Sequence, residues 1–321
     1  MQYNSVDLGK FIASIAIVAL HIPPFGRDDS LLSKGVDFAT SLAVPYFFAV
    51  SAFLYFPKIE GCPFAIQLSG LRHFIRRIAI LYFVWLLINS ILMYERNDEV
   101  WISSFPIQLL FGNTFPGSWF YSALVVCICL CFLIRKMDFS LVLPIGILSY
   151  WYFVLCKEEL IAARTVYNWY ETNISECFLS APYALVWCAM GGVISIAADK
   201  KRKNLLGIYN ICFIVLGLFS VTQLPKGTET ISWLIRFFIV EILLVITVKY
   251  QIKIDLPYRV LRKMSTLIFM IHFFFLYKIK EDFVVFHCIS LKFIITVVGT
   301  LIVSWTIVKL SDRFRLLKYL Y

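Results

Sequence analysis

The chain has 321 residues, of which 60% are hydrophobic and only 16% are charged, and its mean hydropathy is +0.81. Soluble domains are about 45 to 50% apolar and about 25% charged, so this composition excludes an ordinary soluble globular protein. The net charge of +10 would suit a nucleic-acid-binding protein, but the basic residues fall in short patches between apolar blocks, which excludes a continuous basic face.

Ten apolar stretches follow one another along the chain, most of them close to the length at which a helix spans hydrocarbon. Helices are the expected structure, because an open chain in lipid must satisfy its backbone hydrogen bonds within each segment. We expect an all-α transmembrane bundle of about ten spans, formed by residues 1–321 as a single domain. The predicted spans are 8–26, 36–57, 73–93, 117–134, 140–156, 181–198, 204–222, 231–248, 264–279 and 288–309.

The first stretch is predicted to be a mature helix and not a cleaved signal peptide. It has no Ala-x-Ala cleavage site, and it is followed by Pro23, Pro24 and the charged residues Arg27 and Asp28.

The loops between the stretches alternate between basic and acidic. Basic loops face the cytoplasm in membrane proteins, so the alternation predicts an even number of spans with both termini in the cytoplasm. The basic set comprises Lys58, Arg72, Arg76 and Arg77; Arg135 and Lys136; Lys200 to Lys203; Lys249, Lys253, Arg259, Arg262 and Lys263; and Arg313, Arg315 and Lys318.

The nine cysteines do not have the spacing of metal ligands, and we expect no metal site. Cys156 and Cys177 flank a loop that is predicted to lie outside the cytoplasm. Whether they form a disulfide is left open.

Ionisable side chains inside a span cost several kcal/mol unless they are paired or hydrated, so each is a candidate for function. Lys10 and His21 lie in the first span, eleven residues apart. This spacing puts them on one helix face, about three turns or roughly 16 Å apart. The pair also fits a plainer interpretation, a lysine that snorkels to the interface and a histidine that bonds a neighbouring helix. The other candidates are Asp37, Arg236, Glu241 and His272.

The stretch DLGKFIASIAIVALH, from Asp7 to His21, resembles the first helix of the membrane acyltransferase 3 family, which is marked by Arg-x10-His. Lys10 stands in place of the arginine. This replacement keeps the positive charge but loses the forked guanidinium that binds phosphate at two points. Other elements similar to the family follow in its order: 35–54, with Ser51-Ala52 for Ser-Gly; the basic stretch 72–85; 117–124, with Gly117 for a histidine; and 265–272, which ends in His272.

The resemblance implies transfer of an acyl group, often acetyl, from cytoplasmic acyl-coenzyme A to a hydroxyl on the outer side of the membrane. Lys10, Arg72, Arg76 and Arg77 would hold the coenzyme phosphates, although ordinary membrane orientation explains the three arginines equally well. His21 would be the general base, or would carry the acyl group itself; the two routes are not separated by the sequence. Asp37 would orient His21, or else would be a solvated residue near a helix start.

Recognition of the acceptor, a cell-surface carbohydrate by the same resemblance, would involve Trp119, Tyr121, Arg236, Glu241 and His272. Each has a plainer role as an interfacial aromatic or as a polar contact between helices. The resemblance also implies a bacterial inner membrane, while a homo-oligomer stays open. The alternative function is a multi-pass transporter or flippase for a small polar or glycolipid substrate, which would show similar spans with buried charges.

Overall fold

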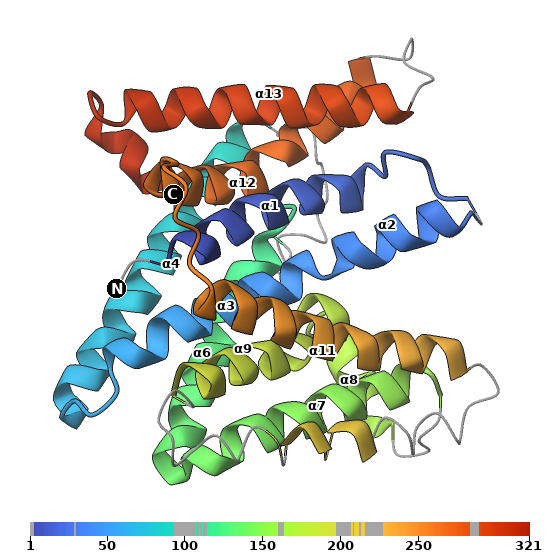
Figure 1. Ribbon diagram of the computed structural model, residues 1–321, viewed down its shortest axis with the longest axis vertical. Coiled ribbons are helices and arrows are strands. Elements are labelled where there is room, and N and C mark those ends of the chain that lie inside the picture. The colour runs from blue at the N-terminus through green and yellow to red at the C-terminus, as the bar shows by residue number, and fades with distance from the viewer. Residues whose placement is uncertain are drawn as a thin grey trace. The chain divides into compact units, whose positions relative to one another are not determined.

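Every element that the structure describes is a helix, and Figure 1 labels the main ones. The structure is a computed structural model. It describes residues 3–28, 30–92, 107, 109, 111, 114–159, 164–196, 207, 209–211, 213–215, 227–282 and 289–321. The α-helices are α1 (Asn4–His21), α2 (Leu31–Ser41), α3 (Ala43–Tyr55), α4 (Phe64–Leu92), α6 (Ser118–Met137), α7 (Val142–Lys157), α8 (Thr165–Asn173), α9 (Ala181–Ile196), α11 (Gly227–Lys249), α12 (Tyr258–Asp282) and α13 (Ile289–Leu310). Short 3-10 turns are η1 (Phe56–Lys58), η2 (Phe139–Leu141), η3 (Cys177–Leu179) and η5 (Arg315–Leu320).

Seven helices of the described chain are long and apolar enough to cross a membrane, with α2 and α3 counted as one, and α7 and α9 are shorter apolar helices. The all-helical membrane class predicted from the sequence is therefore confirmed. The number of spans and the side on which each terminus lies stay predictions. The predicted span 204–222 lies mostly outside the described residues.

Several predicted boundaries were wrong by more than two residues, each for a local reason. The first helix ends at His21, because Pro23 and Pro24 follow one residue later and the chain turns there. The second begins at Leu31, where the Ser30 side chain accepts a hydrogen bond from the backbone N–H of Ser33 and caps the helix. Helix α4 starts at Phe64, and its 28-residue candidate span is about 42 Å long, more than the hydrocarbon needs.

The contacts divide the chain into two compact units. Unit 1 contains residues 1–47 and 243–321, and unit 2 contains residues 48–242. The prediction of a single domain over the whole chain stays a prediction.

In unit 1, helix α1 packs along α12 and α2, and α12 packs along α13 (Figure 1). The first turn of α1 is bound to the segment that precedes α12. The Ser5 hydroxyl donates to the carbonyl oxygen of Tyr250 at 2.6 Å and accepts from the backbone N–H of Ile252 at 2.8 Å. These bonds satisfy polar groups that lipid would leave unpaired, and they fix the start of α12 beside the start of α1.

Helix α13 buries a line of small hydroxyl residues at a spacing of four, Thr296, Thr300 and Ser304. This spacing places them on one face, while Ile302 and Trp305 are exposed on others. Small residues let two helices approach closely in a membrane.

Unit 2 is built on α9, which packs against both α6 and α7. Its Gly191 sits directly on the backbone of α3. A Cβ atom at this position would lie only 1.9 Å from the carbonyl oxygen of Ala49. Only glycine allows this approach, because every other side chain would have to push the two backbones apart.

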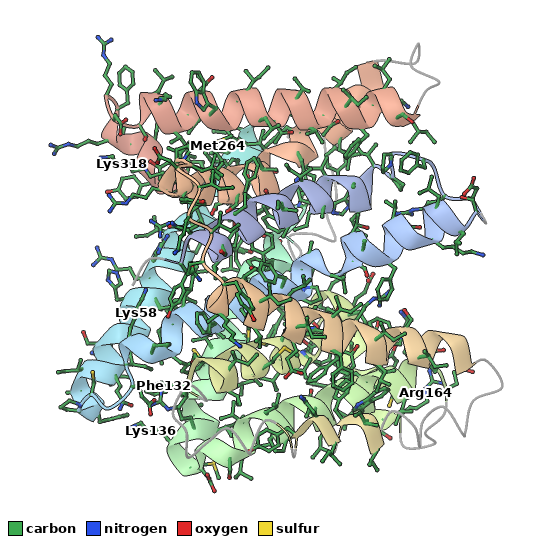
Figure 2. The ribbon with its side chains drawn as sticks, viewed as in Figure 1. Lys58, Phe132, Lys136, Arg164, Met264 and Lys318 are labelled. Atoms are coloured by element: carbon green, nitrogen blue, oxygen red, sulfur yellow. The ribbon has the colours of Figure 1, made fainter. Side chains whose placement is uncertain are left out.

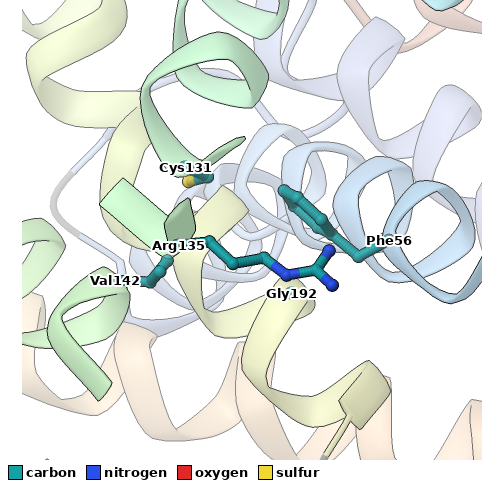
Figure 3. A pocket seen from close by; sticks show the side chains of 5 residues that line it. All are labelled: Phe56, Cys131, Arg135, Val142 and Gly192. Atoms are coloured by element: carbon teal, nitrogen blue, oxygen red, sulfur yellow. The ribbon is translucent and has the colours of Figure 1, made fainter. Parts of the chain in front are cut away.

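One ion pair ties the end of α6 to the segment after α3. Arg135 binds Glu60, and its guanidinium carbon lies 5.8 Å from the centre of the Phe56 ring. Arg135 lines a small gap with Phe56, Gly192 and two other side chains (Figure 3). The gap has no room for a water molecule, so it is a packing feature and not a substrate pocket.

Basic side chains at helix ends lie over aromatic rings. The Lys136 ammonium, in the last turn of α6, is 4.4 Å from the centre of the Phe64 ring and 5.9 Å from that of Phe132; Figure 2 labels Lys136 and Phe132. Such contacts stabilise the position of a cation at a membrane interface.

Cys156 and Cys177 are both free and buried in this structure. Burial raises the pKa of the Cys177 thiol, and the neighbouring Glu171 carboxylate raises it further. The thiol is therefore held in its protonated form, which is a poor nucleophile for disulfide exchange.

The Gly191 contact can be tested by adding a single methyl group. We expect Gly191→Ala to lower the free energy of unfolding by about 1–3 kcal/mol, because overpacking forces the backbones of α9 and α3 apart. Gly35→Ala is the matched control, since a Cβ there meets nothing within 4 Å. The measurement is thermal unfolding of the purified protein in detergent. Equal midpoints for the two variants would contradict the close approach.

Candidate functional site

His21 is the last residue of α1, and its side chain is exposed. Two consecutive rings of α12 contact its imidazole. The centre of the His272 ring lies 5.3 Å away and is stacked at 29°, and that of Phe273 lies 5.0 Å away and is tilted by 60°. One face of the His21 ring is thus held by α12 while the residue remains accessible.

The end of α1 is fixed in place beside this imidazole. A guanidinium N–H of Arg27 donates to the carbonyl oxygen of Leu20 at 3.1 Å, which pairs one of the free carbonyls of the last turn. Ser290 at the start of α13 donates to the carbonyl oxygen of Pro24. The turn after His21 is therefore attached both to its own helix and to α13.

His272 is completely buried. Its Nδ1 lies 3.0 Å from the carbonyl oxygen of Ile268, one turn earlier on α12. A carbonyl only accepts hydrogen bonds, so Nδ1 carries the proton in the neutral ring and Nε2 has a free lone pair. Among the described residues no group bonds Nε2. His272 therefore offers a hydrogen-bond acceptor on a ring that stacks on His21.

The wall around the two imidazoles is aromatic. The Phe273 ring centre lies 4.0 Å from that of His272, and the Phe269 ring centre lies 6.4 Å from it. Phe269 in turn contacts Phe47, with ring centres 6.3 Å apart. The apolar wall reduces competition from water for polar groups bound at the two histidines.

Lys10 is half-buried on α1, and its ammonium lies 5.8 Å from the centre of the Phe47 ring. Because α1 is continuous from Asn4 to His21, Lys10 and His21 keep the predicted separation of about 16 Å along one helix face. One turn before Lys10, Asp7 is buried, and Oδ2 of its carboxylate lies 3.8 Å from Nη1 of Arg262 on α12.

Asp37 is half-buried in α2. Its backbone carbonyl accepts a hydrogen bond from the Thr40 hydroxyl at 3.1 Å. Within the described chain its carboxylate makes no hydrogen bond to His21, whose ring contacts both come from α12. The role of Asp37 as the residue that orients His21 stays a prediction.

The other predicted site residues belong to unit 2. Arg72, Arg76 and Arg77 are exposed on α4, and Arg72 and Arg76 share a face because they are four residues apart. They lie in the third and fourth turns of the helix and not in a loop before it.

Trp119 and Tyr121 lie in the first turn of α6. Trp119 is half-buried against Phe48, with ring centres 6.0 Å apart, and Tyr121 is buried. The residue before this helix, Gly117, has φ of +80°, a left-handed conformation that favours glycine. The backbone at this position therefore suits glycine, where the resemblance leads us to expect a histidine.

Arg236 and Glu241 have separate partners, as their spacing on α11 predicts. The Arg236 guanidinium lies over the Trp233 ring, 4.6 Å from its centre. Glu241 is buried, and its Oε1 accepts a hydrogen bond from the Asn210 amide at 3.0 Å. Both have a partner within unit 2, and whether they also bind an acceptor stays a prediction.

Unit 1 therefore brings together His21 with His272, and Lys10 with Asp7 and Arg262. The first pairing joins two predicted residues, while Asp7, Arg262 and Phe273 were not predicted as site residues. The spacing of three residues between Asp7 and Lys10 was a usable signal, because a carboxylate about one turn from a cation inside a span needs its own partner.

The sequence matches the acyltransferase domain of the acyltransferase 3 family over residues 3–309. A protein of Enterococcus faecalis named amino-acid racemase is 22% identical over 232 residues, which cover 67% of this chain and 31% of that protein. The chain thus spans about a third of the length of this curated relative. No solved structure matches the chain. Because the domain covers nearly the whole sequence, and the described helices include seven that are long and apolar enough to cross a membrane, the chain belongs to the acyltransferase 3 family of multi-pass membrane proteins.

Proposed function

We propose that this protein is an acyltransferase that moves an acyl group, acetyl in the simplest case, from cytoplasmic acyl-coenzyme A to a hydroxyl of a cell-surface carbohydrate on the outer side of a bacterial inner membrane. The observation that carries the proposal is the His21 imidazole, which is exposed at the end of a predicted span and held by two rings of α12. The acyl-coenzyme A donor, the carbohydrate acceptor and the location follow from the family resemblance.

In the proposed reaction a nitrogen of His21 accepts the proton of the acceptor hydroxyl as its oxygen attacks the thioester carbonyl carbon. The new C–O bond forms and the C–S bond breaks, and the coenzyme A thiolate takes up a proton to give the free thiol. Imidazole suits this step, because its unperturbed pKa of about 6.5 lies near the operating pH.

His272 is proposed to bind the acceptor through Nε2. Its buried Nε2 has no hydrogen-bond partner among the described residues and its ring stacks on His21, which supports a role in accepting a hydrogen bond from a carbohydrate hydroxyl. Asp37 is proposed to orient His21, and Trp119, Tyr121, Arg236 and Glu241 are proposed as further acceptor contacts.

Lys10, Arg72, Arg76 and Arg77 are proposed to hold the phosphates of the coenzyme. Lys10 gives a single point charge, and the arginines give forked donors that match phosphate oxygens. Their exposure on α4 supports access for a polyanion.

Binding of the donor can be measured directly. We expect acetyl-coenzyme A to stabilise the detergent-purified protein, by about 2.7 kcal/mol at a concentration of 100 times Kd, since a ligand that binds only the folded state shifts unfolding. The readout is the thermal midpoint. ATP, a polyanion without the thioester, is the control. Equal shifts with both ligands would indicate charge attraction alone.

Loss of the imidazole should stop the chemistry and leave donor binding intact. We expect His21→Ala to reduce release of coenzyme A in native membranes by about 10²–10⁴-fold, the usual contribution of a general base. The exposed His73 on α4 provides the control His73→Ala. Detection of an acyl group on His21 by peptide mass spectrometry would indicate the two-step route through an acyl-histidine and not direct transfer. Full activity of His21→Ala would remove the proposed mechanism.

The variant His272→Phe distinguishes a role of His272 in binding the acceptor from a role in packing alone. Phenylalanine keeps a ring against His21 but lacks Nε2, so we expect transfer to fall about tenfold for one lost hydrogen bond. Thermal stability and acetyl-coenzyme A binding should change little. If His272→Phe transfers the acyl group as the wild type does, while the less well packed His272→Ala transfers it more slowly, then His272 has only a packing role.

A further inference from the structure

A buried carboxylate has two cations near it, one in each of the N-terminal parts of α1 and α12. Asp7 is only 3% exposed. Arg262 approaches its Oδ2 at 3.8 Å, and Lys10, three residues later on α1, is close enough to act on its charge. One negative and two positive charges leave a net charge of +1 at this point.

The position of Arg262 is fixed by more than its own ion pair. The segment before α12 is bonded to Ser5 of α1, and the Gln251 side chain accepts a hydrogen bond from the Ser5 N–H at 3.3 Å. These bonds hold residues 250–252, in the segment that leads into α12, against the first turn of α1. Together with the packing of α1 along α12, they keep the helix that carries Arg262 beside the helix that carries Asp7.

The donors of this guanidinium remain available. The Arg262 side chain is 49% exposed, and at 3.8 Å its contact with Asp7 is a charge contact that is too long for a hydrogen bond. In the described part of the chain no hydrogen bond uses its N–H groups, and Asp7 Oδ2 has no hydrogen-bond partner. Asp7 thus attracts the guanidinium without occupying its fork.

The surrounding charge favours an anion. Arg259 is exposed three residues before Arg262 on the same helix, and the Lys263 ammonium lies 5.1 Å from the centre of the Tyr321 ring. Residues three apart on a helix share a face, so Arg259 and Arg262 present two guanidinium groups to the same side.

We propose that Arg262, supported by Lys10 and positioned by Asp7, binds a phosphate monoester, the 3′-phosphate of acyl-coenzyme A. The assignment rests on the proposed function. Arg262 supplies the planar fork that binds two phosphate oxygens, which Lys10 lacks. The phosphodiester of an anionic lipid has related chemistry. The coenzyme is the favoured ligand because its 3′-phosphate is a monoester with two negative charges.

The test compares acetyl-coenzyme A with acetyl-3′-dephospho-coenzyme A by calorimetry in neutral phosphatidylcholine nanodiscs. Wild-type protein is expected to prefer the ligand that has the 3′-phosphate. Arg262→Gln should weaken binding of acetyl-coenzyme A about tenfold and abolish the preference, because a charge-assisted bidentate contact is lost. Arg262→Lys, which keeps the charge without the fork, should show a smaller loss and is the second variant if Arg262→Gln does not fold.

Arg313→Gln is the matched control, since it removes the same charge from an exposed arginine of unit 1. It should bind both ligands as the wild type does. Equal losses in Arg313→Gln and Arg262→Gln would overturn the proposal in favour of bulk charge. The proposal would also be overturned if Arg262→Gln still preferred the ligand that has the 3′-phosphate, or if this variant changed binding only in nanodiscs that contain phosphatidylglycerol. Failure of wild-type protein to bind either ligand would instead count against the proposed function as a whole.

Discussion

The packing of α1 against α12 is the contact on which unit 1 depends. Lipid gives no hydrogen bonds, so each polar group of α1 must find a partner in protein or face water. The first turn meets this requirement through Ser5 and Asp7, and the last turn places His21 on the rings of α12. A single helix pair thus sets the cationic end and the imidazole end at once. Their separation is fixed by the rise of α1 alone.

Most of the architecture follows from the sequence, because hydrocarbon thickness leaves few choices for an apolar stretch. The predicted stretches 117–134 and 288–309 coincide with α6 and α13 within a few residues. Hydropathy locates the part of a helix that lies in lipid. It says little about the polar turns beyond it, and for this reason the starts of α4 and α12 lie several residues before the predicted ones.

The candidate site was only partly predictable. His21, Lys10 and His272 follow from their cost inside a span and from the family resemblance. The stacking of His21 on His272 needs the register of two helices that are about 250 residues apart in sequence, and no spacing rule supplies it. Arg262 was assigned with its neighbours to membrane orientation, because the burial of Asp7 that distinguishes it is visible only in the fold.

Gly117 carries a consequence for attempts to restore the family motif in this chain. Its left-handed backbone leads directly into α6, where Ser118 is fully buried and Trp119 contacts Phe48. A histidine introduced there would cost about 1–2 kcal/mol in that conformation, or would turn the start of α6 and move Trp119. A histidine at this position would therefore require a change in the backbone before α6 as well as in the side chain.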